Sequence, residues 1–119
     1  MKKVWFFFDY GSDPVWYQDD HLETRTNGVP PKLENDKKFI KFMDELYEEY
    51  SSLFINNSYE FTYVGFKDEK SWRKFIKKVN KFIKLLKKSV EPEYEVHLEQ
   101  WEKGQLMRLK PVYEVIEKD

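Results

Sequence analysis

The sequence has no cysteine, which excludes disulfide bonds, thiolate catalysis and zinc sites built on cysteine. It also has no run approaching the roughly 20 apolar residues that a membrane-spanning helix needs. The apolar run near the start ends at Asp9 with no small-residue cleavage site after it, so it predicts a strand rather than a secretion signal. Glycine and proline are scarce, at 4 and 5 of 119 residues. We therefore expect a soluble, cytoplasmic protein that forms one domain over residues 1–119.

Aromatic and charged side chains are abundant instead. Phe, Tyr and Trp make up 18% of the chain, which is typical of a protein that folds around an apolar core. The net charge is only −1, but the charges are segregated along the chain. Residues 67–88 contain ten Lys or Arg and two acids, whereas residues 44–60 and 91–102 each contain five acids and no Lys or Arg. This segregation predicts separate basic and acidic surfaces.

The hydrophobic periodicity predicts two helices among several strands. Alternation near the N-terminus places Val4, Phe6 and Phe8 in the core, and a helical stripe runs as far as Phe54. Asp68 is a predicted N-cap for the second helix. The expected elements are strands over residues 2–10 and 15–18, a polar loop over 21–36, a helix over 35–54 capped by Asn35 or Asp36, a strand over 59–66 with Tyr59, Phe61 and Tyr63 on one face, a helix over 69–88, and strands over 93–101 and 106–116 joined by a turn at 102–105.

This order, β-β-α-β-α-β-β, has hairpins at both ends. Hairpins favour antiparallel pairing, and two amphipathic helices need a sheet face on which to bury their apolar stripes. The sequence therefore predicts an α+β domain with a mainly antiparallel or mixed sheet and both helices packed on one face.

Catalytic motifs are missing from the sequence. It has no Walker A loop, no dinucleotide-binding glycine motif, no H-E-x-x-H and no serine in a nucleophile elbow. His21 in the polar loop and His97 on an outward strand face are expected to be surface histidines. Clustered carboxylates near the N-terminus could hold Mg²⁺ or Ca²⁺, but their spacing matches no metal-binding loop. These carboxylates are Asp9, Asp13, Asp19 and Asp20. We expect no enzyme, no cofactor and no metal, with a small metal-dependent enzyme as a distant alternative.

The lysine-rich second helix favours a different function, nucleic-acid binding. Lysines outside its apolar stripe could contact phosphates, although Arg73 is its only arginine and the flanking segments are acidic. The candidate phosphate-binding residues are Lys74, Lys77, Lys78, Lys81 and Lys84. This function is the alternative to protein binding, and we expect no membrane binding.

Protein binding accounts best for the acidic, aromatic-rich segments. Tyr and Trp are frequent anchors of protein interfaces, and acidic groups attract a basic partner. A nuclease is a basic partner of this kind, because its active site must hold phosphate. The first candidate binding set is Tyr10, Asp13, Trp16, Tyr17, Asp19, Asp20 and Glu23. The second is Asp44, Glu45, Glu48 and Glu49, with Glu60 just beyond.

The opening MKKVWFFFDYGSDPVWYQDD, the chain length and the Lys/Glu/Asn/Phe/Tyr-rich composition resemble those of bacterial toxin-immunity proteins. These proteins belong to contact-dependent growth inhibition and other polymorphic toxin systems, and the resemblance is strongest over roughly residues 1–66. It implies a cytoplasmic, non-enzymatic protein that neutralises the C-terminal toxin domain of a cognate toxin, often a nuclease, by covering its active site. It transfers no specific residues to this chain.

Overall fold

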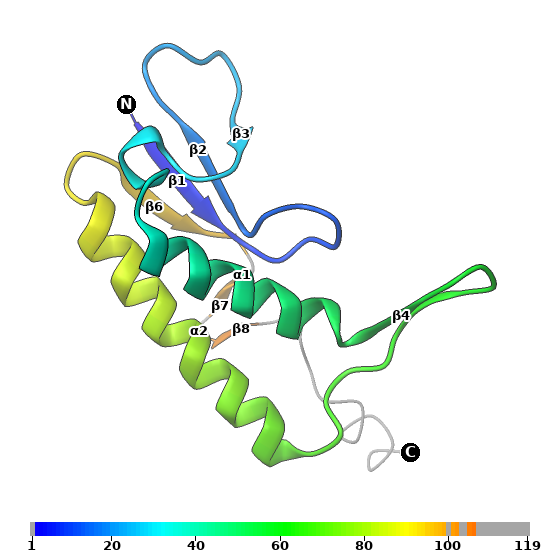
Figure 1. The fold of residues 1–119 in the computed structure, drawn as a ribbon. Coiled ribbons are helices and arrows are strands. Elements are labelled where there is room, and N and C mark those ends of the chain that lie inside the picture. The colour runs from blue at the N-terminus through cyan, green and yellow to red at the C-terminus, as the bar shows by residue number, and fades with distance from the viewer. Residues whose placement is uncertain (1, 100, 103–104, 107–119) are drawn as a thin grey trace.

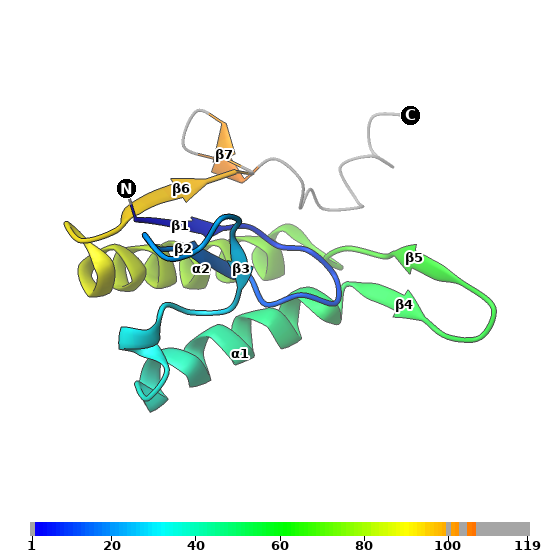
Figure 2. The ribbon, with the colours of Figure 1, turned by 90° about the horizontal axis from the view of Figure 1, so that it is seen from above.

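The computed structural model describes residues 2–99, 101–102 and 105–106, and it has the expected α+β architecture. A mixed four-stranded sheet is covered on one face by two helices, and a separate two-stranded hairpin projects from the end of the first helix (Figures 1 and 2). The elements are β1 (Lys3–Phe6), β2 (Val15–Gln18), β3 (Thr26–Asn27), the 3-10 helix η1 (Pro31–Leu33), α1 (Lys37–Ser51), β4 (Phe54–Asn56), β5 (Phe61–Tyr63), α2 (Glu69–Val90), β6 (Glu95–Leu98), β7 (Trp101–Glu102) and β8 (Gln105–Leu106).

The sheet has the strand order β3-β2-β1-β6. β1 pairs antiparallel with β2 and parallel with β6, so the first and last strands of this sheet lie side by side, with β6 at its edge. The predicted alternation is confirmed: Val4, Phe6 and Phe8 are each at most 2% exposed and face the helices. The predicted loop over 21–36 contains β3 and η1, so part of it forms regular secondary structure.

The two helices share one core with the sheet. Phe82 of α2 is fully buried and its ring lies 5.3 Å from Phe6, 5.0 Å from Phe39 and 5.4 Å from Phe42. The Phe82 ring of α2 therefore contacts both the sheet and α1. Both helices begin at the predicted aspartate caps, since Asp36 accepts a hydrogen bond from the Phe39 N–H and Asp68 accepts one from the Ser71 N–H.

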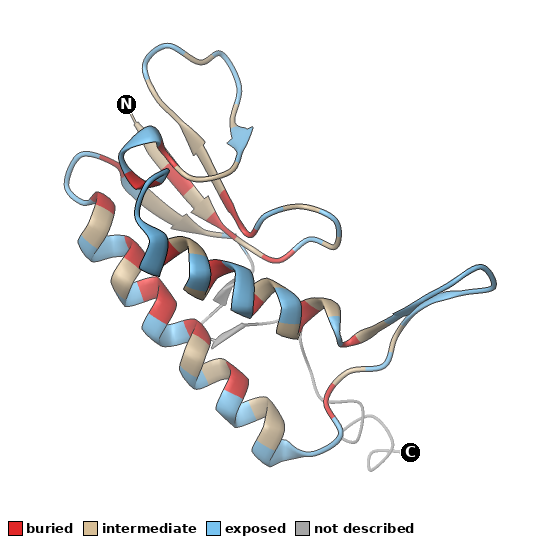
Figure 3. Cartoon of the chain, viewed as in Figure 1, coloured by how far each residue is buried: buried red, intermediate tan, exposed pale blue. Residues whose placement is uncertain are grey.

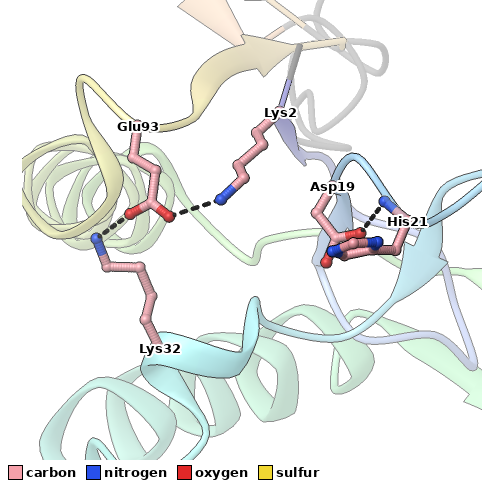
Figure 4. Close-up of polar contacts among 5 residues, drawn as sticks. All are labelled: Lys2, Asp19, His21, Lys32 and Glu93. Atoms are coloured by element: carbon pink, nitrogen blue, oxygen red, sulfur yellow. Dashed lines mark hydrogen bonds and ion pairs between the residues drawn. The ribbon is translucent and has the colours of Figure 1, made fainter.

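An ionic contact fixes the start of β1 to the loop between α2 and β6. The Glu93 carboxylate accepts hydrogen bonds from the Nζ atoms of Lys2, at 3.0 Å, and Lys32, at 3.1 Å (Figure 4). These two hydrogen bonds, that from Lys2 first, hold the pKa of Glu93 below its usual value. The hydrogen bond to Glu93 likewise raises the pKa of Lys2. One carboxylate thus ties together the N-terminus, η1 and the end of α2.

The first helix was predicted to run as far as Phe54, and this is wrong. α1 ends at Ser51, and Phe54 begins a strand that the sequence reading missed. The chain turns at Asn57, whose side-chain Oδ1 accepts hydrogen bonds from the N–H groups of Tyr59 and Glu60. This turn closes a β4–β5 hairpin in place of the single strand predicted over 59–66. Phe54 fits the helical spacing although it lies outside the helix, and its ring still packs 5.2 Å from that of Tyr50.

The C-terminal part agrees with the prediction only in part. β6 lies within the strand predicted over 93–101, but Trp101 belongs to a separate strand, β7. β7 pairs antiparallel with β8 in a sheet of its own, and Glu102 and Gln105, which were predicted as turn residues, are strand residues. Residues 107–116 of the predicted last strand lie outside the described residues.

Candidate protein-binding surface

A hydrogen bond between two uncharged groups holds the turn between β1 and β2 against α1. The Gly11 N–H donates to the Tyr47 hydroxyl oxygen at 2.6 Å, and Gly11 has a φ of 90°, which favours glycine. Asn27 of β3 holds the other side of the turn: its Oδ1 accepts from the Asp13 N–H at 3.0 Å, and its Nδ2 donates to the Asp13 carbonyl at 2.8 Å. The backbone at Asp13 is therefore fixed to β3, two residues from the contact of Gly11 with α1.

This docking gathers carboxylates from two parts of the chain. Asp13 lies close enough to Asp44 of α1 to raise its pKa, together with Glu48; partial desolvation is the largest cause of that rise. Glu45 and Glu48 line, with Asp44, a shallow hollow of about 500 Å³ along α1. The hollow also contains Glu34, Lys37, Ile40 and Lys41. We call Asp13, Asp44, Glu45 and Glu48 the acidic patch.

The acidic patch combines one residue of the first predicted binding set with three of the second. The rest of the first set does not join it, because β2 separates Asp13 from the acids that follow the strand. Asp19 Oδ1 accepts a hydrogen bond from the His21 N–H at 2.9 Å and so helps to form the next turn (Figure 4). Asp20 and Glu23 are exposed in the same loop. The predicted set therefore occupies both ends of β2.

The three aromatic members of that set lie in three different places. Tyr17 is paired with the fully buried Val4 and packs against the core on the helix-covered face. Trp16 is on the opposite face, where it stacks on Phe7 at 6.0 Å. The Tyr10 ring packs against the β4–β5 hairpin, and its hydroxyl oxygen accepts a hydrogen bond from Asn56 Nδ2 at 3.2 Å.

The sheet face opposite the helices carries a cluster that the sequence reading missed. The Arg25 guanidinium lies over the rings of Trp5, Phe7 and Trp16, at 5.1 to 5.5 Å from their centroids, and also pairs with Glu99. The Arg25 guanidinium stabilises this cluster by packing its positive charge against the faces of the aromatic rings. The outward alternation of residues 5 and 7 could have indicated this second apolar face, but nothing in the sequence indicated the position of Arg25. His97, expected at the surface, is half-buried and stacks on Trp5 at 5.9 Å.

The five candidate lysines of α2 divide into two groups. Lys74, Lys77, Lys81 and Lys84 are exposed, whereas Lys78 is half-buried and forms an ion pair with Glu49 of α1. The exposed group is a row of cations on the outer side of α2. Lys78 instead connects the two helices, which is why its charge is less available to a ligand.

The described residues include neither a cluster that could hold a metal ion nor a helix that could cross a membrane. No group of three or more His, Asp or Glu side chains among those residues could hold a metal ion, and the N-terminal aspartates do not converge. No helix within the described ranges is sufficiently long and apolar to cross a membrane. Comparison of the chain with protein-family models, curated proteins and solved structures finds no match.

Proposed function

We propose that this protein is an immunity protein that binds a cognate bacterial toxin and covers its basic active site. The observation that carries the proposal is the acidic patch, in which Asp13 lies near Asp44 of α1 and Asp44 lines a hollow together with Glu45 and Glu48. Such a cluster attracts a positively charged partner and speeds its association. A nuclease is the toxin class that fits best, because its active site must carry positive charge to hold phosphate. The role requires no catalytic group in this chain and implies a cytoplasmic protein.

The test is a binding titration with the purified product of the adjacent open reading frame, made catalytically inactive. We expect nanomolar affinity that weakens as salt rises, because screening reduces the attraction between exposed charges. Asp13→Lys should weaken binding by at least about tenfold at low salt, since it reverses a charge within the acidic patch. The matched control is Glu23→Lys, an equal charge change at the other end of β2, which should change affinity less than about twofold. Absence of nanomolar binding by the unmodified protein would contradict the proposal.

The exposed lysine row of α2 favours nucleic-acid binding as a second candidate function. No ion pair is found for Lys74, Lys77, Lys81 or Lys84 among the described residues, so their charges are open to phosphates. Titration of duplex DNA and of single-stranded RNA at roughly 50 and 200 mM salt decides the matter. Affinity that falls steeply with salt and is lost in Lys77→Glu/Lys81→Glu would support this candidate, and affinity without salt dependence would remove it.

A further inference from the structure

Within residues 2–99, the exposed large apolar side chains all lie on or next to one projecting element, the β4–β5 hairpin. They are Ile55, Tyr59, Phe61 and Val64. Tyr59 is 95% exposed and Phe61 is 56% exposed, and the hairpin extends well beyond the sheet and helices (Figures 1 and 3). Single exposed apolar residues are ordinary on protein surfaces. Their confinement to one protrusion is typical of a binding element.

The hairpin is held in shape from its base to its tip. The rings of Phe54 and Phe61 stack in parallel at 5.2 Å, and Tyr10 packs edge-on against both. At the tip, Asn57 receives two hydrogen bonds through its side chain and donates a third from its N–H to the Glu60 carbonyl at 3.0 Å. A side chain presented from a fixed turn loses less conformational freedom on binding than one on a loose loop.

The charges around the hairpin indicate the chemistry of its partner. Residues 44–60 contain five acids and no Lys or Arg, and β4 follows directly on the end of α1 that carries the acidic patch. In a symmetric dimer of this chain, these acids would face the same acids of the second copy, and the like charges would repel. An anionic membrane would also repel them. A basic protein with an apolar cleft satisfies both the aromatic rings and the carboxylates.

We propose that the β4–β5 hairpin inserts Tyr59 and Phe61 into an apolar cleft of the same basic toxin that the acidic patch attracts. This inference rests on the proposed function and assigns different roles in binding to two surfaces. The acidic patch steers the encounter, whereas the aromatic tip anchors the complex once it has formed. Buried Tyr and other aromatic side chains are the residues that most often dominate binding energy in interfaces.

The experiment measures association and dissociation rates of the inactivated adjacent-gene product with three variants of the full chain. Tyr59→Ser should raise the dissociation rate at least about tenfold with little change in the association rate or its salt dependence. Glu45→Lys/Glu48→Lys should instead lower the association rate and its salt dependence. Ser58→Ala, at the neighbouring tip position, is the matched control and should behave like the unmodified protein. Because the Tyr59 side chain is almost fully exposed, its loss should leave the melting temperature unchanged.

The outcomes separate the two proposals. Binding that is unaffected by Tyr59→Ser overturns the hairpin inference and leaves the proposed function standing. Absence of binding by the unmodified protein overturns both. Light scattering with size-exclusion chromatography adds a third readout: a dimer of this chain that Tyr59→Ser converts to a monomer would assign the hairpin to self-association and overturn its assignment to the toxin.

Discussion

The two helices pack side by side on one sheet face but distribute their charges in opposite ways. α2 has Asp68 and Glu69 at its start and Lys87 and Lys88 in its last turn, which is the arrangement that the helix dipole favours. α1 has an aspartate N-cap too, Asp36, but it has no acid in its first turn and no basic residue in its last turn. Within the helix, its lysines lie toward the N-terminal end and its acids toward the C-terminal end. Beyond the N-cap, the dipole of α1 therefore opposes the charges of the helix.

This difference teaches that local helix stability does not explain the charges of α1. Burial raises the pKa of Asp44, and repulsion from Asp13 and Glu48 adds to the rise, so the folded state is less favourable to the charged form. Among the described residues, Glu49 is the one acid of α1 that forms an ion pair with α2, through Lys78. The acids of α1 are better understood as a surface for a partner, as proposed above, than as part of the scaffold.

The largest effect on stability is expected from a substitution in the core that both helices share, where the difference between their surface charges plays no part. Phe82→Ala deletes a fully buried ring that contacts both β1 and α1. We expect a loss of about 3–5 kcal/mol in the free energy of unfolding, because the cavity cannot be filled by small shifts. Urea denaturation followed by circular dichroism measures it. Lys81→Ala, the exposed neighbour, is the control and should change stability by less than about 0.5 kcal/mol. A loss in Phe82→Ala as small as that in Lys81→Ala would contradict the central place of the ring in the core.

The same contrast separates what sequence patterns could predict from what they could not. α2 was predicted within two residues because its aspartate cap, its apolar stripe and its flanking Pro92 all agree. α1 was overextended because Phe54 lies four residues after Tyr50, a spacing that a hairpin base can satisfy as well as a helix. Period alone does not distinguish the two over a single turn.

The candidate surface was predictable in its residue types but not in its assembly. Asp13 and Asp44 were each singled out, but in different sets, because their approach depends on the contact between Gly11 and Tyr47, which are far apart in sequence. Tyr59 at the exposed tip was predicted to lie on a strand face, since the sequence does not distinguish an exposed tyrosine from a buried one. Long-range contacts, and the exposure of a hairpin tip whose residues alternate like those of a buried strand, depend on the folded chain and are not encoded in local periodicity.

The second prediction reverses one charge in the last turn of each helix. Glu48→Lys places a cation at the C-terminal end of α1, and we expect the free energy of unfolding to rise by about 0.3–1 kcal/mol. Lys88→Glu on α2 should lower it by a similar amount. Both side chains are exposed, so neither change disturbs the core. Urea midpoints at low salt measure the pair, and the difference should shrink in about 1 M salt. If Glu48→Lys destabilises the protein, the charges of α1 are not in conflict with its dipole.

The smallest expected effect is the pH dependence of the carboxylate at the centre of the acidic patch. Because the folded state raises the pKa of Asp44 above 3.8, its charged form costs stability above the folded pKa, and that cost disappears as the pH falls through it. Asp44→Asn is neutral at every pH, so it should raise the melting temperature slightly at pH 7. The gain should vanish near pH 3, where Asp44 is protonated in both folded and unfolded chains. Thermal melts of the two proteins across this range measure the difference, with Asp20→Asn in the loop after β2 as a control. A gain that persists at pH 3 would show that the amide stabilises the fold by a route other than relief of repulsion. A loss at pH 7 would show that the Asp44 carboxylate supports α1, and the acids of the two helices would then differ less than their positions indicate.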